Sequence, residues 1–442
     1  MSRPAPSGPR AAPSSTATSS TALLTDQYEL TMLDAALADG TAERRCTFEV
    51  FARSLPHGRR FGVVAGPTRV LEALARFTLA EAEIATLRDT GAISDTTLEY
   101  LGGARFRGDV VGYAEGELYF PGSPVMSVTG TFAECVLLET LVLSILNHDC
   151  AIASAAARMT TAAQGRRLIE MGSRRTHEEA AVAAARAAYL AGFDATSNLE
   201  AHRRYGVPTT GTSAHAFTLL HDTEEAAFRA QVAALGVGTT LLVDTYDITE
   251  GIETAVRVAG PELGAVRIDS GDLGVMAQRA RAQLDELGAT ATRIVLSGDL
   301  DEHAIAGLRA EPVDAYGVGT SLVTGSGAPT AGMVYKLVEV DGRPVAKRSS
   351  SKESWGGSKS AVRRHKPTGT AVEEVVHRVS SPVEIGEYDR VVPVPLVKAG
   401  EPVADLPSLA DAREHLRRGL VAVPWEGLKL SRGEPAIPTT FG

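Results

Sequence analysis

Cysteine is scarce in this sequence, and so are aromatic residues. The 442 residues include three cysteines, Cys46, Cys135 and Cys150, which form no CxxC pair and are odd in number. A disulfide-rich secreted scaffold is therefore excluded, and a reducing cytoplasmic compartment fits best. Aromatic residues make up only 5% of the chain, whereas glycine alone contributes 43 residues. This composition favours helices packed closely on a sheet over a β-sandwich.

Long hydrophobic runs are also lacking. The most apolar stretch, 136–146, is interrupted by Glu139, Thr140 and Ser144 and is too short to span a bilayer. Residues 1–20 are rich in Ser, Pro, Ala and Thr without an apolar core, so we expect a disordered tail rather than a signal peptide. The net charge of −10 argues against nucleic acid or an anionic membrane as a partner.

The first third of the chain predicts a smaller α/β domain over residues 21–130. A capped amphipathic helix is expected to begin near Thr25 and Asp26, and residues 46–52 alternate like a strand. Residues 108–120 have the pattern of a hairpin.

Residues 131–345 predict a second α/β domain. An apolar helix is expected at 131–148, followed by short apolar strands that alternate with helical stretches. Eight segments fit as strands: 168–171, 193–195, 207–209, 241–243, 265–268, 293–296, 315–318 and 333–337. This alternation predicts a (β/α)₈-type barrel or an irregular relative of one. The alternative is an open doubly wound sheet, but no GxGxxG follows a first strand.

Polar and glycine-rich residues follow seven of these strands, at the point where each strand ends. In barrels the active site is built at the carboxyl ends of the strands, so we expect one functional face. The candidates on this face are Arg174, Arg175, Thr212, Ser213, His215, Asp244, Arg267, Asp269, Ser297, Gly298, Asp299, Gly319 and Thr320.

Several of these residues suit an anionic ligand. The glycines of 297–299 and 317–320 let backbone N–H groups approach a phosphate, and late barrel strands are the usual phosphate position. Arg174, Arg175 and Arg267 match a carboxylate or phosphate with two hydrogen bonds. An ion pair at the surface is the alternative for at least one of Arg174 and Arg175.

Four aspartates at the strand ends could hold Mg²⁺, which prefers oxygen ligands and bridges phosphates. Asp244 and Asp269 are the metal candidates. Asp247 and Asp272 precede helical stretches and are better explained as N-caps.

A basic stretch lies beyond the last expected strand. Residues 343–366 contain eight Lys or Arg residues and one acid, Glu353. In an acidic protein this excess indicates a mobile loop that holds pyrophosphate; the alternative is a solvated basic surface.

Together these segments resemble the nicotinate phosphoribosyltransferases, which are type II phosphoribosyltransferases. The resemblance runs from about residue 20 to 430, with the motifs in the family's order. They are Thr25-Asp-Gln-Tyr28, Gly-Ser-Arg174-Arg175, Gly211-Thr-Ser-Ala-His215, Arg267-Ile-Asp-Ser-Gly-Asp, Ser297-Gly-Asp299 and Gly317-Val-Gly-Thr320. One departure is Lys352 to Lys359, where many relatives carry a lysine motif that contains Pro-Gly.

The resemblance implies an activity and roles for some residues. The family makes nicotinate mononucleotide and pyrophosphate from nicotinate and phosphoribosyl pyrophosphate, in NAD salvage, with ATP as a co-substrate. His215 would be the histidine that ATP phosphorylates. Tyr28, Thr212 and Arg267 would bind nicotinate, and Thr320 a phosphate. Tyr28 would reach the site of a neighbouring subunit in a homodimer, and residues 346–442 would pack back onto the N-terminal domain.

Two other functions fit the same residues less closely. A quinolinate-type phosphoribosyltransferase would need neither His215 nor ATP, and a non-catalytic barrel would bind a sugar phosphate without releasing pyrophosphate. Nicotinate is expected rather than nicotinamide, because the turn at Thr212 and Ser213 has arginines nearby and no aspartate to accept from an amide. An arginine–carboxylate bond is worth about 1.5–3 kcal/mol.

Overall fold

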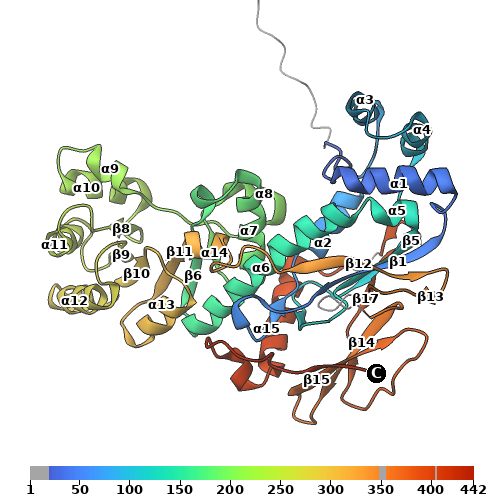
Figure 1. Cartoon of the computed structure of the whole chain (residues 1–442). Coiled ribbons are helices and arrows are strands. Elements are labelled where there is room, and N and C mark those ends of the chain that lie inside the picture. Colours follow the sequence, from blue (N-terminus) through green and yellow to red (C-terminus); the bar gives the residue numbers. More distant parts are fainter. Residues whose placement is uncertain (1–18, 348–354, 404–405) are drawn as a thin grey trace, which may run out of the picture.

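A computed structural model of the chain describes residues 19–347, 355–403 and 406–442. The described residues form a six-stranded parallel half-barrel and three further sheets of seven, four and two strands (Figure 1). The half-barrel lies at one side of the molecule, and the seven-stranded and four-stranded sheets lie at the other. Five helices surround the half-barrel: α9 (His215–Leu219), α10 (Glu224–Leu235), α11 (Ile248–Ala259), α12 (Leu273–Glu286) and α13 (Glu302–Gly307). The expected disordered tail falls mostly outside the described residues.

The largest sheet has seven strands drawn from three parts of the sequence. Its order is β13 (Arg343–Pro344), β12 (Met333–Val340), β1 (Arg45–Ala52), β5 (Met126–Thr131), β3 (Asp109–Gly112), β17 (Val394–Lys398) and β18 (Glu401–Pro402). Neighbouring strands pair antiparallel throughout. The pairing of β17 with β3 places the C-terminal segment directly against the N-terminal part of the chain.

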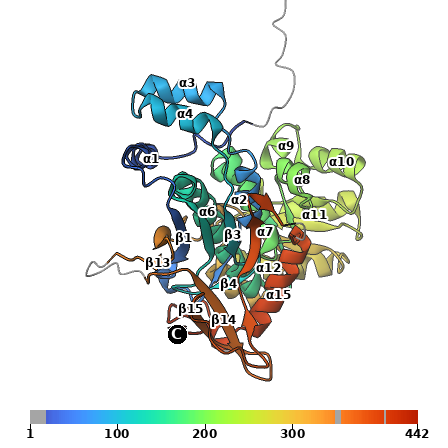
Figure 2. The same ribbon diagram turned by 90° about the vertical axis from the view of Figure 1, so that its right-hand side faces the viewer.

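A second sheet comes entirely from the C-terminal segment. It contains β16 (Arg390–Val391), β14 (Lys359–His365), β15 (Ala371–Arg378) and β19 (Thr439–Phe441). Figure 2 shows β14 and β15 at one end of the molecule, whereas α3 (Glu81–Thr90) and α4 (Asp95–Gly103) lie at the other. Between them, α15 (Leu409–Ala422) packs against α7 (Glu178–Leu190).

The parallel sheet has six strands and does not close. Its order is β7 (Ala195–Thr196), β6 (Arg167–Glu170), β11 (Ala315–Val318), β10 (Arg293–Ser297), β9 (Ala265–Ile268) and β8 (Thr240–Leu242). All neighbours run parallel. The prediction of an irregular barrel with a smaller α/β domain is confirmed, but the expectation of eight barrel strands is wrong at two places.

The third and eighth expected strands are not part of this sheet. Segment 207–209 makes only a bridge between Thr196 and Thr209, because Pro208 has no N–H to donate to a ladder. Segment 333–337 lies in β12, which pairs antiparallel with β1 in the other sheet. Its side chains alternate between buried and half-buried, as expected of an antiparallel strand with one covered face.

The hairpin expected at 108–120 does not form. β3 pairs with β5 and β17, whereas β4 (Leu118–Tyr119) pairs with β2 (Gly62–Val63) in a separate two-stranded sheet. The chain crosses between the sheets at Gly116, whose positive φ of 83° and hydrogen bond to Val64 O set the turn.

The apolar helix expected at 131–148 forms as two helices. Thr131 and Glu134 make a capping box at the start of α5 (Phe132–Val136), and α6 (Glu139–Ala163) follows. α6 packs against α2 (Pro67–Leu74), α7, α13 (Glu302–Gly307) and β2. By length and composition α6 could cross a membrane, but 72% of its most apolar window is buried inside the protein, as in a core helix.

The described part of the basic stretch 343–366 includes strand β14. Its two most buried cations form ion pairs with buried carboxylates inside the protein. Lys359 Nζ lies 2.7 Å from Glu49 Oε2, and the Arg363 guanidinium pairs with both Glu117 and Glu374. The expectation of a mobile pyrophosphate clamp is therefore wrong for Lys359 and Arg363. Lys352 and Arg348 lie outside the described residues.

Arg363 should be essential for stability. Burial alone would raise the pKa of Glu117, but Arg363, with His415 and Arg390, holds it well below its usual range. We expect Arg363→Met to lower the free energy of unfolding by about 3–5 kcal/mol, because it leaves buried carboxylates without a partner. Chemical denaturation measures the change.

Arg364→Met is the matched control. Its side chain is 41% exposed and pairs with Glu373, so the loss should stay below about 1 kcal/mol. Equal losses in the two variants would contradict a structural role for Arg363.

Candidate functional site

A cavity of about 750 Å³ opens at the carboxyl ends of the parallel strands. Residues that follow β6, β9, β10 and β11 line it, together with the loop 210–215. Twelve of the residues expected at the site lie on its wall: Arg174, Arg175, Thr212, Ser213, His215, Arg267, Asp269, Ser297, Gly298, Asp299, Gly319 and Thr320. Asp244 and Tyr28 are not among the lining residues.

His215 begins α9 (His215–Leu219) and stands between two polar partners. Its Nδ1 lies 3.1 Å from Thr245 Oγ1, and its Nε2 lies 3.9 Å from Asp244 Oδ1. The imidazole is 42% exposed, so it remains open to the cavity. A proton on Nε2 would face the carboxylate, and Nδ1 would then accept from the Thr245 hydroxyl.

Asp244 lies below the cavity and joins two strand ends. Its side chain is 1% exposed, and its Oδ2 accepts from Asp269 N and Ser270 Oγ, each at 2.8 Å. Its Oδ1 has no hydrogen-bond partner within the described chain. The unpartnered oxygen is the one that faces His215.

Arg267, Asp269 and Ser297 form a closed group on β9 and β10. Arg267 Nε donates to Ser297 Oγ at 2.8 Å, and one of its Nη atoms lies 3.3 Å from Asp269 Oδ2. Ser297 Oγ in turn donates to Asp269 Oδ1 at 2.9 Å. These contacts fix the guanidinium at the cavity wall with donors left for a ligand.

Close backbone packing requires glycine in the first of the two turns expected to hold phosphate. Gly298 has φ 106°, and a Cβ there would lie 2.6 Å from Asp269 O. At Gly317 a Cβ would lie 2.7 Å from Met171 Sδ, which is a side-chain contact that Met171 can relieve by moving. Asp299 also has a positive φ, 35°, which is uncommon for a residue other than glycine. The backbone N–H groups of these turns thus stay accessible to an anion.

Glu170 supports the turn that carries Arg174 and Arg175, and the sequence analysis missed it. Its buried carboxylate accepts from Gly172 N and from Thr196 Oγ1, which links β6 to β7. Burial raises the pKa of Glu170, since no cation pairs with it in the described chain. The available signal was an acid at the end of an otherwise apolar strand.

Comparison with known proteins agrees with this geometry. The chain matches the model of the nicotinate phosphoribosyltransferase (NAPRTase) N-terminal domain over residues 23–147 and that of the NAPRTase family over residues 166–368. It is 68% identical over 425 residues to "Nicotinate phosphoribosyltransferase pncB1" of Mycobacterium tuberculosis, covering 94% of each chain. It is 31% identical to the human nicotinate phosphoribosyltransferase, covering 93% of this chain and 89% of the relative.

This chain belongs to the nicotinate phosphoribosyltransferase family. Solved structures of related enzymes have the same fold. The human nicotinic acid phosphoribosyltransferase matches with a TM-score of 0.82 at 26% identity, covering 95% of this chain and 97% of that one. The nicotinate-nucleotide pyrophosphorylase of Pyrococcus furiosus shares the fold, with a TM-score of 0.76 at 24% identity over 90% of this chain and 96% of that one.

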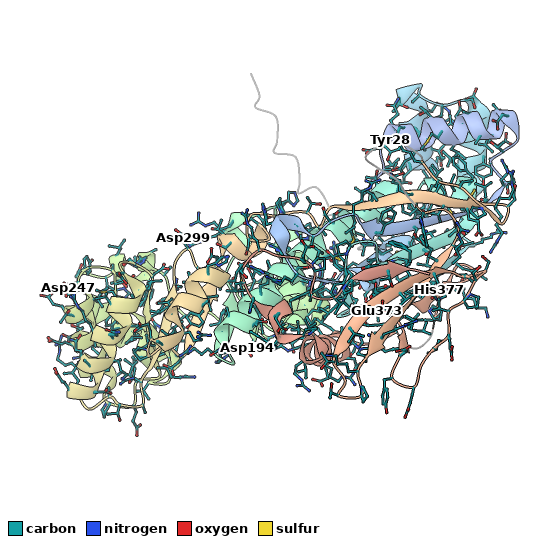
Figure 3. All side chains as sticks on the ribbon, turned by 60° about the horizontal axis from the view of Figure 1, so that its bottom comes forward. Tyr28, Asp194, Asp247, Asp299, Glu373 and His377 are labelled. Atoms are coloured by element: carbon teal, nitrogen blue, oxygen red, sulfur yellow. The ribbon has the colours of Figure 1, made fainter. Side chains whose placement is uncertain are left out.

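Tyr28, which the family resemblance links to nicotinate, lies far from the cavity of its own chain. It is on α1 (Gln27–Asp39) at one end of the molecule, and Figure 3 shows it well separated from Asp299, which lies nearer the middle. Its side chain is partly exposed. Desolvation, together with Glu139 and Glu29, raises the pKa of Tyr28 to about 12, so the phenol keeps its proton at neutral pH.

Of the four aspartates considered as metal ligands, two cap helices and two lie at or beside the cavity. Asp247 accepts from Thr249 N and Glu250 N at the start of α11 (Ile248–Ala259), and Asp272 caps α12 (Leu273–Glu286), as expected. No group of three or more His, Cys, Asp or Glu residues in the described chain has the arrangement of a metal site. Any Mg²⁺ would need ligands from a substrate as well.

Glu224 is a further acid beside Asp244 and Asp247, and its sequence pattern gave no sign of this. It begins α10 (Glu224–Leu235). Desolvation and the carboxylates of Glu250, Asp244 and Asp247 raise the pKa of Glu224 to about 7. At neutral pH this carboxyl group is therefore partly protonated.

Glu224 should make stability depend on pH. Because its pKa is higher in the folded than in the unfolded chain, the folded state binds more protons between about pH 4.5 and 7, and stability falls as the pH rises through that range. We expect Glu224→Gln to unfold at a higher temperature than the parent above pH 7, with the difference vanishing near pH 5. Thermal unfolding between pH 5 and 8 measures it.

Glu225→Gln is the control. Hydrogen bonds from Arg229 and Arg257 lower the pKa of Glu225, so its replacement should not stabilise the protein at any pH in this range. Parallel pH curves for the parent and Glu224→Gln would overturn the prediction.

Proposed function

We propose that the protein is a nicotinate phosphoribosyltransferase that forms nicotinate mononucleotide and pyrophosphate from nicotinate and phosphoribosyl pyrophosphate, coupled to ATP hydrolysis, in NAD salvage. One observation carries the proposal: the residues of the family's motifs from four neighbouring strand ends line a single cavity. The 68% identity to a relative of that name, over 94% of both chains, supports it.

The transfer needs charge stabilisation more than a strong nucleophile. The pyridine nitrogen of nicotinate supplies the electron pair of the new bond to the ribose C1, and the C1–O bond to pyrophosphate breaks, so the leaving group keeps that bond's electrons. Positive charge develops on the ribose and negative charge on the pyrophosphate. Arg267 would bind the nicotinate carboxylate, and Thr212 would line the pocket for the ring.

The two glycine-rich turns would hold the phosphates. Gly298 and Asp299 follow β10, and Gly319 and Thr320 follow β11, so the turns are neighbours in the sheet. Arg174 and Arg175, from the next strand, add positive charge to the same wall. This arrangement supports the expected binding of the ribose phosphate by Thr320.

Mg²⁺ would neutralise charge on the pyrophosphate. Asp269 suits it better than Asp244, since Asp269 lines the cavity, whereas Asp244 is buried and one of its oxygens already accepts two hydrogen bonds. Asp269 with oxygens of the substrate would match the few protein ligands that Mg²⁺ commonly has.

His215 would carry phosphate from ATP. Asp244 Oδ1, which faces Nε2, can hold a proton there and leave Nδ1 as the nucleophile. Attack of Nδ1 on the terminal phosphorus would break the bond to ADP, which leaves with the electron pair, and Nδ1 would give up its contact with Thr245. The new charge would order the cavity through hydrogen bonds from nearby donors.

The buried free cysteines fit the expected cytoplasmic location, which cell fractionation would test.

Loss of His215 should remove the effect of ATP. We expect His215→Ala to release pyrophosphate from nicotinate and phosphoribosyl pyrophosphate at one rate with or without ATP, whereas ATP accelerates the parent enzyme. A pyrophosphate-release assay with nicotinate, and in parallel with quinolinate, measures this.

His221→Ala is the control, because His221 belongs to the same short region but does not line the cavity. Full ATP stimulation in His215→Ala would overturn the phosphohistidine. Turnover of quinolinate without ATP would favour the quinolinate-type enzyme instead.

A homodimer would complete the site. Tyr28 lies far from its own cavity and is partly exposed, so a second copy could bring it to the nicotinate pocket. Exposed apolar residues near the cavity, Leu219, Leu220 and Tyr246, would suit such a contact.

Mixing two defective variants tests the shared site. Arg267→Met should lower kcat/KM for nicotinate about tenfold to a hundredfold, because it removes the charge-assisted bond to the carboxylate. Tyr28→Ala should impair the partner's cavity. Reassociated mixtures should regain up to about a quarter of the parent activity, because half of the dimers are mixed and each has one intact site.

Arg267→Met mixed with Thr212→Val is the control, since both changes fall in the same cavity of their own chain and cannot complement. A Tyr28→Ala mixture no more active than the mean of its components would contradict the shared site.

A further inference from the structure

A second cavity, of about 360 Å³, lies apart from the first and shares no lining residue with it. It is bounded by the turn η1 (Pro56–Gly58), the start of α13 and the C-terminal segment 430–432. Its charged lining is mainly cationic, with Arg59, Arg158 and Arg432 against one carboxylate, Glu302. A protein of net charge −10 thus gathers positive charge around a small hollow.

The buried cations of this cavity outnumber its carboxylates, although Arg158 also donates to Leu430 O at 3.0 Å. Arg158 Nε donates to Glu302 Oε1 at 2.9 Å, and the other carboxylate oxygen accepts from Ser326 Oγ at 2.6 Å. Arg59 is only 5% exposed and has no carboxylate partner in the described chain; its guanidinium donates to Gly325 O. Desolvation and the neighbouring Arg158 lower the pKa of Arg59 by more than the nearby Glu302 raises it. An uncompensated buried charge is costly, and an anion in the cavity would offset it.

The walls of the cavity are held in place by specific contacts. Arg60 donates to Ser431 O and Glu434 O, which fixes the segment that carries Arg432 at the rim. His57 has φ 54° and contacts Gly327 O at 3.2 Å through Nε2. These contacts indicate a preformed hollow rather than a chance gap between surface side chains.

We propose that this cavity is a second anion site, which binds a phosphate group between the guanidinium groups of Arg59 and Arg158. Guanidinium groups match phosphate oxygens in bidentate geometry, and Arg432 with His57 and His303 would close the rim. The phosphate could be inorganic phosphate or part of pyrophosphate or ATP.

The site is placed to influence the first cavity. Ser326 follows α14 (Thr320–Val323), whose first residue lines the first cavity, and Glu302 follows Asp299 by three residues. A phosphate bound to Arg158 and Arg59 would change their hydrogen bonds to Glu302 and to Gly325 O. Because these two residues follow the turns at Gly298 and Thr320 in the chain, the change would be transmitted to both turns.

Crystals of the full chain soaked in tungstate, a heavy phosphate analogue, locate the anions directly. We expect anomalous density between Arg59 and Arg158. Density confined to the turns at Gly298 and Thr320, or none in the second cavity, overturns the proposal. Because the two positions are resolved separately, this result does not depend on the function proposed for the first cavity.

Equilibrium dialysis with labelled phosphate, pyrophosphate and ATP then measures affinity and identifies the preferred source. Arg432→Glu should weaken anion binding at the second cavity at least about tenfold, since a charge-assisted contact becomes repulsive. Arg59→Met should abolish binding at that cavity and leave binding at the first cavity unchanged. Arg309→Glu, an exposed charge reversal on the neighbouring η3 (Leu308–Ala310) outside the cavity, should bind like the parent. Unchanged binding in Arg432→Glu and Arg59→Met would contradict the site.

Discussion

The carboxylate of Asp244 connects the frame of the parallel sheet to the histidine at the cavity. One of its oxygens accepts from Asp269 N and Ser270 Oγ, so the loops after β8 and β9 keep a fixed spacing. The other oxygen is buried, lacks a partner in the described chain and faces His215. Leaving a buried carboxylate oxygen unsatisfied is costly, and His215 Nε2, 3.9 Å from it, lies beyond hydrogen-bonding distance. The hydrogen bond between His215 Nδ1 and Thr245 Oγ1 therefore orients the imidazole, and Asp244 places a negative charge beside its other nitrogen.

The order of strands in the sheet determines which residues lie at the centre of the cavity and which lie at each flank. β10 and β11 occupy the centre, with β9 and β8 on one side and β6 and β7 on the other. The glycine turns thus lie in the middle, Arg174 and Arg175 on one flank, and Arg267 with His215 on the other. A substrate with phosphates at the centre would have its base near β9, beside the histidine near β8. Chain order alone does not show this, because β11 inserts between β6 and β10.

Much of the site could be predicted because its signals are local. Apolar strands that end in glycine and polar residues indicate a binding face wherever the strands are parallel, and the cavity contains twelve of those residues. The partners of buried charges could not be predicted. Arg363 reaches Glu117, 246 positions away, and a basic stretch looks the same whether it binds a ligand or fills a core. The alternation of β12 also fits either sheet, and only pairing with β1 decides between them.

The irregularity that made the eight-strand prediction wrong also bears on the proposed homodimer. β8 pairs with no strand beyond β9 in the described residues, and the far side of β7 carries only the bridge to Thr209. Both edge strands are three residues long or shorter, which limits uncontrolled edge pairing. A closed barrel would surround its cavity with its own helices, whereas an open sheet would give a second copy access from one side. In the proposed homodimer Tyr28, which is exposed and remote from the cavity of its own chain, would be the group that the second copy contributes.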